Sequence, residues 1–169
     1  IWLQKKDFEK RGSYEQKIIK KIRYAIGRTD YDYAYSTVFH KDLKYFNCNE
    51  TLRDIFYKNS WKYEKCHKHR ILLSQGYYPL KGIHFVIKAV ILVLEKYPDT
   101  EVLIAGPDII RGNSKTGYLR GSGYANYLRR LIKKNKLNGR VSFIGRQNTN
   151  EMCARYLESN VFISASSTE

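Results

Sequence analysis

Four short apolar runs, separated by helical patterns, constrain the fold of this chain more than any other feature. The helical patterns are clearest over residues 82–96 and 124–134, where apolar residues recur every three or four positions. The apolar runs cover residues 71–74, 102–105, 141–144 and 161–164. Short apolar strands that alternate with helices are typical of parallel βαβ units covered on both faces. The sequence therefore predicts an α/β fold: a partial doubly wound, Rossmann-like parallel sheet of about four strands, preceded by helical segments.

The rest of the chain gives weaker patterns. Residues 1–26 are expected to be helical because apolar side chains recur there at helical spacing. Residues 31–50 are rich in tyrosine and polar residues, and no element is assigned to them. A short helix is expected after Asn49, which suits an N-cap. Asn148 is expected to cap a further helix, with Glu151 completing a capping box.

Each apolar run ends in small or polar residues, and in open α/β sheets ligands bind beyond these strand ends. The residues concerned are Ser74-Gln75-Gly76, Ala105-Gly106, Gly145-Arg146 and Ser164-Ala165-Ser166-Ser167. Lys81 and Gly82 stand between the first run and the helix after it. Backbone N–H groups at a helix start carry partial positive charge, to which a lysine adds a full charge. A Gln75 amide beside them can donate to the same anion, so the sequence predicts a phosphorylated, nucleotide-linked ligand.

The net charge of +15 favours anionic partners, namely nucleic acid, an anionic membrane surface or phosphorylated ligands. The 15 tyrosines interleave with basic residues, which is compatible with a basic nucleic-acid-binding module that stacks bases on aromatic rings. No recognised RNA-binding signature accompanies them. A phosphosugar-binding protein without catalytic activity is a third interpretation. These alternatives remain open at the level of composition and pattern.

The cysteines and the apolar segments exclude several classes of protein. Cys48, Cys66 and Cys153 are odd in number and lack metal-binding spacing, so we expect a reducing compartment, no disulfide framework and no metal site. No apolar run approaches the roughly 20 residues of a membrane span. The sequence also lacks a Walker loop, a Gly-x-Gly-x-x-Gly fingerprint and a Gly-x-Ser-x-Gly elbow.

The order and spacing of these motifs resemble a known family. Residues 70–169 look like the first half of the C-terminal, donor-binding domain of GT-B glycosyltransferases of retaining family 4, also called glycosyl transferase group 1. Residues 27–32 and 47–53 resemble the stretch that closes the N-terminal domain of that fold. The motifs that carry the resemblance are Ser74-Gln75-Gly76, Lys81-Gly82, Tyr97-Pro98-Asp99, Ala105-Gly106, Val141-Ser142-Phe143-Ile144-Gly145 and Ser164 to Glu169.

The resemblance implies roles for particular residues. Lys81 matches the lysine that contacts the donor diphosphate, whereas Gln75 stands where the family usually has a second cation. Arg146 and Gln147 follow Gly145, where the family lines its base pocket. Further donor-binding positions are Gly76, Gly82, Gly106 and Gly145. Glu169 matches the first glutamate of a catalytic Glu-x7-Glu pair that holds the sugar and ribose.

The resemblance also implies a function for the whole protein. We expect a hexosyltransferase that moves a sugar, with retention, from a UDP or GDP donor to a glycan or lipid-linked acceptor in polysaccharide or cell-surface biosynthesis. No cofactor, metal or specific nucleic acid is expected. We expect the protein in the cytoplasm, with peripheral contact to an anionic inner membrane face. Residues 1–66 would end the acceptor-side domain and form the linker, residues 67–169 would begin the donor domain, and this fragment alone would be inactive.

Overall fold

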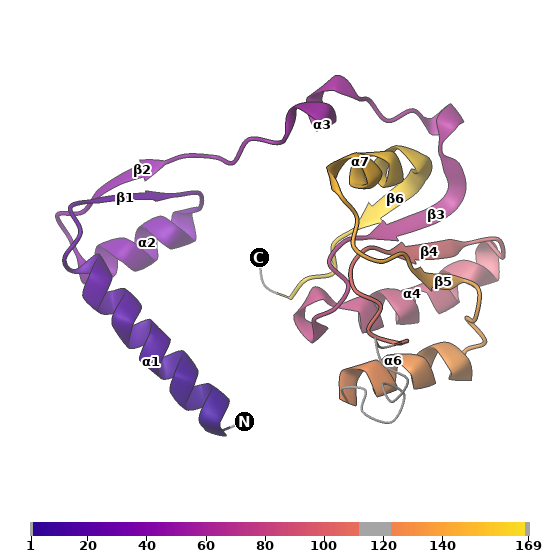
Figure 1. Ribbon diagram of the computed structural model, residues 1–169, viewed down its shortest axis with the longest axis horizontal. Helices are drawn as coiled ribbons and strands as arrows, with labels where there is room; N and C mark the ends of the chain where they lie inside the picture. The colour runs from indigo at the N-terminus through magenta and orange to yellow at the C-terminus, as the bar shows by residue number, and fades with distance from the viewer. Residues whose placement is uncertain (1, 112–122, 168–169) are drawn as a thin grey trace. The chain divides into compact units, whose positions relative to one another are not determined.

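The computed structural model describes residues 2–111 and 123–167 (Figure 1). The chain divides into two compact units, Ile1–Leu52 and Arg53–Glu169. The sequence predicted a boundary between residues 66 and 67, whereas the two units meet between Leu52 and Arg53. Residues 53–66 pack within the second unit. The Trp61 indole donates a hydrogen bond to the Ser159 carbonyl oxygen at 2.8 Å.

The first unit is a small βαβ arrangement that follows a long helix. Its elements are α1 (Trp2–Ile19), β1 (Tyr24–Gly27), α2 (Asp30–Phe39) and β2 (Lys44–Asn47). The two strands pair in parallel, with Tyr24 opposite Lys44 and Gly27 opposite Asn47. The crossover between the two strands is made by α2.

One sequence-based expectation for this unit is wrong, and one segment was left without an assignment. The helix expected over residues 1–26 ends at Ile19, and β1 occupies the last of those positions. The segment 31–50 contains most of α2 and all of β2, although no element was assigned to it. A capping box begins α2: the Thr29 hydroxyl accepts from the Asp32 N–H, and the Asp32 carboxylate accepts from the Thr29 N–H, both at 3.1 Å. The Thr-x-x-Asp signature was therefore the available signal.

The second unit confirms the predicted α/β fold. Its four strands form a wholly parallel sheet in the order β5-β4-β3-β6. This order places the first strand of the unit, β3, in the interior of the sheet, as in a doubly wound fold. The elements are α3 (Asp54–Lys58), β3 (His67–Leu73), α4 (Ile83–Lys96), β4 (Glu101–Ile104), α6 (Gly123–Lys134), β5 (Val141–Phe143), α7 (Thr149–Glu158) and β6 (Ser159–Ile163), with 3-10 turns at Tyr63–Lys65 and Pro79–Lys81.

The two expected helix caps have different outcomes. Asn148 caps α7 as predicted: its side chain accepts from the Glu151 N–H at 2.9 Å, and the Glu151 carboxylate accepts from the Asn148 N–H at 2.8 Å. Asn49 does not cap α3, because that helix begins later and Arg53 stands at its N-cap without a side-chain hydrogen bond.

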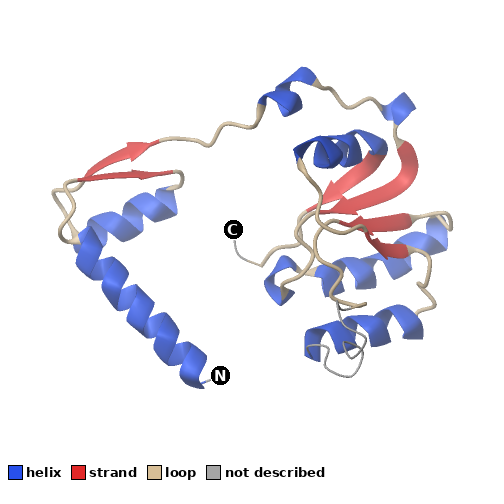
Figure 2. Cartoon of the chain, viewed as in Figure 1, coloured by secondary structure: helices blue, strands red, loops and turns tan. Residues whose placement is uncertain are grey.

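The core lies between the sheet and two helices that cover one of its faces (Figure 2). Alternate strand residues point to opposite faces, so Ile71 and Leu73 lie on the α4 and α6 side while Leu72 points to the other side. Core residues from α4 and α6 are Ile83, Val86, Ile87, Val90, Leu128 and Ile132. α7 contacts β3 and β6, and the reversal of strand order after β5 places it on the opposite face. Within the described ranges, no helix combines the length and apolarity needed to cross a membrane.

Candidate functional site

The loops that follow β3, β4 and β5 are joined by backbone hydrogen bonds at the carboxyl edge of the sheet. The Gly76 N–H donates to the Ala105 carbonyl at 3.1 Å, and the Gly106 N–H donates to the Gly145 carbonyl at 2.8 Å. The Ala105 N–H in turn donates to the Leu73 carbonyl at 2.8 Å. These bonds extend the sheet past its regular strands and hold the three loops in a fixed arrangement.

The first of these loops leads into α4 through a 3-10 turn over Pro79–Lys81. Gly82 ends this turn and precedes α4, in the left-handed conformation with φ of 70°. A Cβ atom on Gly82 would lie 2.0 Å from the Ala165 carbonyl oxygen, so a side chain cannot fit there. The Ser167 N–H donates to the Leu80 carbonyl at 2.9 Å, which ties this turn to the segment after β6.

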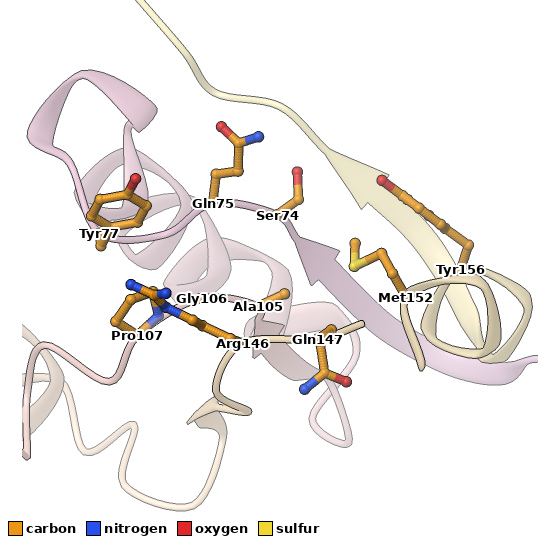
Figure 3. Close-up of a pocket in the computed structure, with 10 residues that line it drawn as sticks. All are labelled: Ser74, Gln75, Tyr77, Ala105, Gly106, Pro107, Arg146, Gln147, Met152 and Tyr156. Atoms are coloured by element: carbon orange, nitrogen blue, oxygen red, sulfur yellow. The ribbon is translucent and has the colours of Figure 1, made fainter. Parts of the chain in front are cut away.

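A cavity of about 500 Å³ opens at this edge of the sheet. It is lined by Ser74, Gln75, Tyr77, Ala105, Gly106, Pro107, Arg146, Gln147, Met152 and Tyr156 (Figure 3). The first eight come from the three joined loops or their neighbours, whereas Met152 and Tyr156 come from α7. In Figure 3, the Arg146 side chain extends toward the end of the cavity where Pro107 and Tyr77 lie.

A smaller cavity of about 210 Å³ adjoins the first and shares Ser74 and Gln75 with it. Lys81 lines this second cavity, together with Ser164 and Ala165 from the segment after β6. Lys81 is half-buried, so its ammonium group is partly shielded from solvent.

The two adjoining cavities are electropositive. Lys81 and Arg146 are their charged lining residues, and no carboxylate lines either cavity in the described part of the chain. Neither Lys81 nor Arg146 makes an ion pair with another described residue. Their charges are therefore available to an anionic ligand, and α4 begins at Ile83, two residues after Lys81.

The α7 side of the larger cavity is aromatic. The Tyr156 ring packs edge-on against Phe56 and Phe162, with centroid separations of 6.0 and 5.2 Å. Burial raises the pKa of the Tyr156 phenol above its ordinary value, although a hydrogen bond with the Ser74 side chain opposes this shift. The phenol therefore remains protonated near neutral pH and keeps its hydrogen-bonding capacity at the cavity wall.

The structure brings together most of the residues that the sequence singled out. Gln75, Gly106, Arg146 and Gln147 line the larger cavity, and Lys81 lines the smaller one. The Gln147 side chain donates to the Ile144 carbonyl at 2.8 Å, so it also fixes its own loop. The remaining glycines, Gly76, Gly82 and Gly145, shape the loop backbones. Glu169 lies outside the described residues.

Sequence reasoning missed Tyr77, Pro107, Met152 and Tyr156 as lining residues. Met152 and Tyr156 lie one helical turn apart and were assigned to a buried face of their helix. Both are instead half-buried, and it is Cys153 that points into the core. A spacing of four residues indicates only that two side chains share one face of a helix. No signal in the sequence showed that this face lines a cavity.

Comparisons with known proteins give one family match. The model of the family described as glycosyl transferases group 1 matches residues 56–169. No curated protein sequence gives a significant match.

Solved structures share the fold at low sequence identity. The pneumococcal O-GlcNAc transferase GtfA, in complex with UDP and GlcNAc, has a TM-score of 0.64 and 16% identity over 92% of this chain. A mutant of S. aureus TarM, in complex with fondaparinux, alpha-GlcNAc-glycerol and UDP, has a TM-score of 0.65 and 16% identity over 93%. The sucrose-phosphate synthase of Thermosynechococcus elongatus has a TM-score of 0.65 and 19% identity over 95%. This chain spans 28%, 28% and 39% of those three chains, respectively.

Proposed function

Because this chain belongs to the glycosyl transferases group 1 family, we propose that its two strand-end cavities bind the nucleotide diphosphate of a sugar donor. One observation carries the proposal: Lys81 and Arg146 face adjoining cavities without an ion-pair partner or a lining carboxylate among the described residues. A diphosphate bears the complementary charge. The cavities also lie at the sheet edge where α/β folds bind nucleotides.

The reaction that we propose is transfer of the sugar to an acceptor oxygen with retention of configuration. The bond between the anomeric carbon and the diphosphate breaks, a bond to the acceptor oxygen forms, and the acceptor proton passes to the departing diphosphate. Negative charge develops on the departing diphosphate. Fixed cations stabilise this charge most strongly in the transition state, which is how Lys81 and Arg146 would accelerate transfer.

The identity of the donor and acceptor is a further part of the proposal. GtfA and TarM were each solved with UDP, so a UDP-hexose is the first donor to test, ahead of a GDP-hexose. We propose a glycan or lipid-linked acceptor of polysaccharide or cell-surface biosynthesis, and a reaction in the cytoplasm at the inner membrane face. The resemblance to family 4 supports a mechanism without metal or cofactor, with Glu169 holding sugar and ribose hydroxyls.

Binding of nucleotides by the 169-residue chain tests the proposal. We expect UDP to bind more tightly than UMP, and UMP more tightly than uridine, in isothermal titration calorimetry. Equal affinity for UDP and uridine would contradict a diphosphate site. A gel shift with RNA, without any response to UDP or GDP, would instead favour the basic nucleic-acid-binding module.

Lys81→Ala should weaken UDP binding roughly ten- to a hundredfold, because a hydrogen bond to a charged group contributes about 1.5–3 kcal/mol. In an enzyme that contains the complete donor and acceptor domains, the same change should lower turnover sharply. Lys62→Ala is the matched control, since Lys62 is an exposed lysine outside both cavities. Unchanged UDP affinity in Lys81→Ala would remove this lysine from the site.

A further inference from the structure

The outward side of α4 carries large apolar side chains between lysines. Phe85, Lys88, Leu92 and Lys96 are all exposed, with exposed fractions of 56% for Phe85 and 68% for Leu92. Their spacing of three to four residues places them along one ridge of the helix. A helix that buries its opposite side in the core is expected to present polar residues here, so Phe85 and Leu92 require an explanation.

α6 presents a similar ridge beside it. Tyr127, Arg130 and Lys134 are exposed at the same helical spacing, and Tyr127 has an exposed fraction of 40%. The two helices cover the same face of the sheet, and they are linked at their N-terminal ends by a hydrogen bond of 3.1 Å between His84 Nδ1 and the Tyr124 hydroxyl. We call the surface formed by both ridges the α4–α6 face: Phe85, Lys88, Leu92, Lys96, Tyr127, Arg130 and Lys134.

The α4–α6 face has a strong positive charge. Its four cations make no ion pair with any residue in the described ranges. Glu95 is the one acidic residue of α4, and α6 has none. Exposed cations around protruding apolar side chains are the pattern by which helices lie on anionic membranes.

We propose that the α4–α6 face docks on an anionic lipid surface. Phe85, Leu92 and Tyr127 enter the headgroup region, and the surrounding lysines and arginine pair with lipid phosphates. Leu92 favours lipid over nucleic acid because an aliphatic side chain cannot stack on a base, whereas its burial in the acyl boundary removes apolar surface from water.

The position of the face relates docking to the candidate donor site. α4 begins directly after the loop that carries Lys81, so its N-terminal end lies at the same sheet edge as the two cavities. A protein docked through this face would hold the donor site beside the membrane, where lipid-linked acceptors reside. Only this last link depends on the proposed function; docking itself does not.

Co-sedimentation of the 169-residue chain with vesicles tests docking. We expect binding to phosphatidylcholine vesicles that contain phosphatidylglycerol, little binding to phosphatidylcholine alone, and weakening by salt. The triple variant Lys88→Glu, Arg130→Glu, Lys134→Glu should reduce partitioning at least tenfold, because each cation near the surface contributes roughly a fivefold gain. The pair Phe85→Ser, Leu92→Ser should reduce partitioning several-fold without changing the net charge.

The control carries the same change of charge elsewhere. Lys58→Glu, Lys62→Glu, Lys65→Glu alters exposed lysines in and after α3, which contacts α7 on the opposite side of the sheet. We expect this control to bind anionic vesicles clearly better than the triple variant of the α4–α6 face. Equal losses in both would reduce the effect to net charge and overturn the assignment to this face.

Two other outcomes would also overturn the proposal. Equal binding to neutral and anionic vesicles is one. The other is a combination of two results. If the triple variant abolishes an RNA gel shift, and the Phe85→Ser, Leu92→Ser pair leaves vesicle binding unchanged, the face binds nucleic acid and not lipid. UDP titration of the same variants separates membrane docking from donor binding. A variant that binds UDP normally but no longer binds vesicles has lost docking alone.

Discussion

Lys81 and Arg146 come from loops far apart in the sequence, yet they face adjoining cavities at one edge of the sheet. The resemblance to GT-B enzymes led us to expect a second cation at position 75, where this chain has a glutamine. The exposed Arg146 side chain enters the same cavity as Gln75 (Figure 3). At the scale of single residues, we therefore expect Arg146 to supply the charge that position 75 lacks.

Relocating this charge tests that expectation. Arg146→Gln alone should weaken UDP binding roughly tenfold or more, because a charge-assisted hydrogen bond becomes a neutral one. Adding Gln75→Arg in the same chain should restore much of the loss, measured by calorimetry with UDP. If the double variant binds no better than Arg146→Gln, the two positions do not serve one phosphate group.

Gly82 allows a second test at the residue scale. Gly82→Ala should destabilise the second unit by about 1–3 kcal/mol, because it combines a left-handed backbone with a clash against the Ala165 carbonyl. Gly139→Ala is the matched control: Gly139 has φ of 80°, but a Cβ atom there meets nothing within 4 Å. Urea unfolding should show the larger loss for Gly82→Ala, and equal losses would mean that the close approach to Ala165 has no effect.

At the scale of elements, capping boxes begin both α2 and α7. Each box satisfies two backbone N–H groups that a helix start otherwise leaves without a partner. In α2 the Asp32 carboxylate accepts from the N–H groups of Arg28 and Thr29, both at 3.1 Å. The hydrogen bond from the Arg28 N–H is the main cause that lowers the pKa of Asp32 below its ordinary value of 3.8.

This lowered pKa predicts a pH dependence for α2. A depressed carboxyl pKa contributes stability that is fully present above the unfolded value and is lost as the pH falls through the folded value. The stability of the first unit should therefore fall as the pH drops below about 4. In Asp32→Asn this contribution disappears, so the difference in melting temperature between wild type and variant should narrow towards pH 2. A constant difference across this range would contradict the assignment.

At the scale of the whole molecule, the two units differ in the size of their cores. Among the described residues, Ile19 and Leu43 are the only buried hydrophobic residues of the first unit. The second unit contains the main core cluster, which extends over β3, β4, α4 and α6. A two-stranded sheet with a small core is only marginally stable in water, whereas a four-stranded sheet covered by helices is stable on its own.

Hydrogen exchange should reveal this difference. Amides of β1 and β2 should exchange faster than those of β3 and β4, because their local opening costs less free energy. UDP should slow exchange in the loops after β3, β4 and β5 and leave the first unit unchanged. Hydrogen exchange of the 169-residue chain can be measured by mass spectrometry. Protection confined to β1 and β2 would contradict both the larger core of the second unit and the binding of UDP at its loops.

The sequence by itself determined the sheet of the second unit, the capping of α7 and the loops that line the site. The central strands β3 and β4 are buried on both faces over Ile71–Leu73 and Val102–Ile104, and such burial requires continuous apolar runs that can be recognised in the sequence alone. β1 and β2 were missed because they are short and little buried. Ala25 and Ile26 of β1 fitted the helical spacing expected over residues 1–26, and β2, with the sequence Lys-Tyr-Phe-Asn, has no apolar run. Local periodicity predicts on which side of its own helix or strand a residue lies, but it does not predict which other element that side contacts.

Only the tertiary structure decided which residues meet. Met152 and Tyr156 became cavity walls because α7 crosses back over the sheet after β5, a step that no local pattern encodes. Arg146 and Lys81 face adjoining cavities because parallel strands bring all their carboxyl ends to one edge. The α4–α6 face likewise exists only because both crossovers run on the same side of the sheet, which places two separate ridges next to each other.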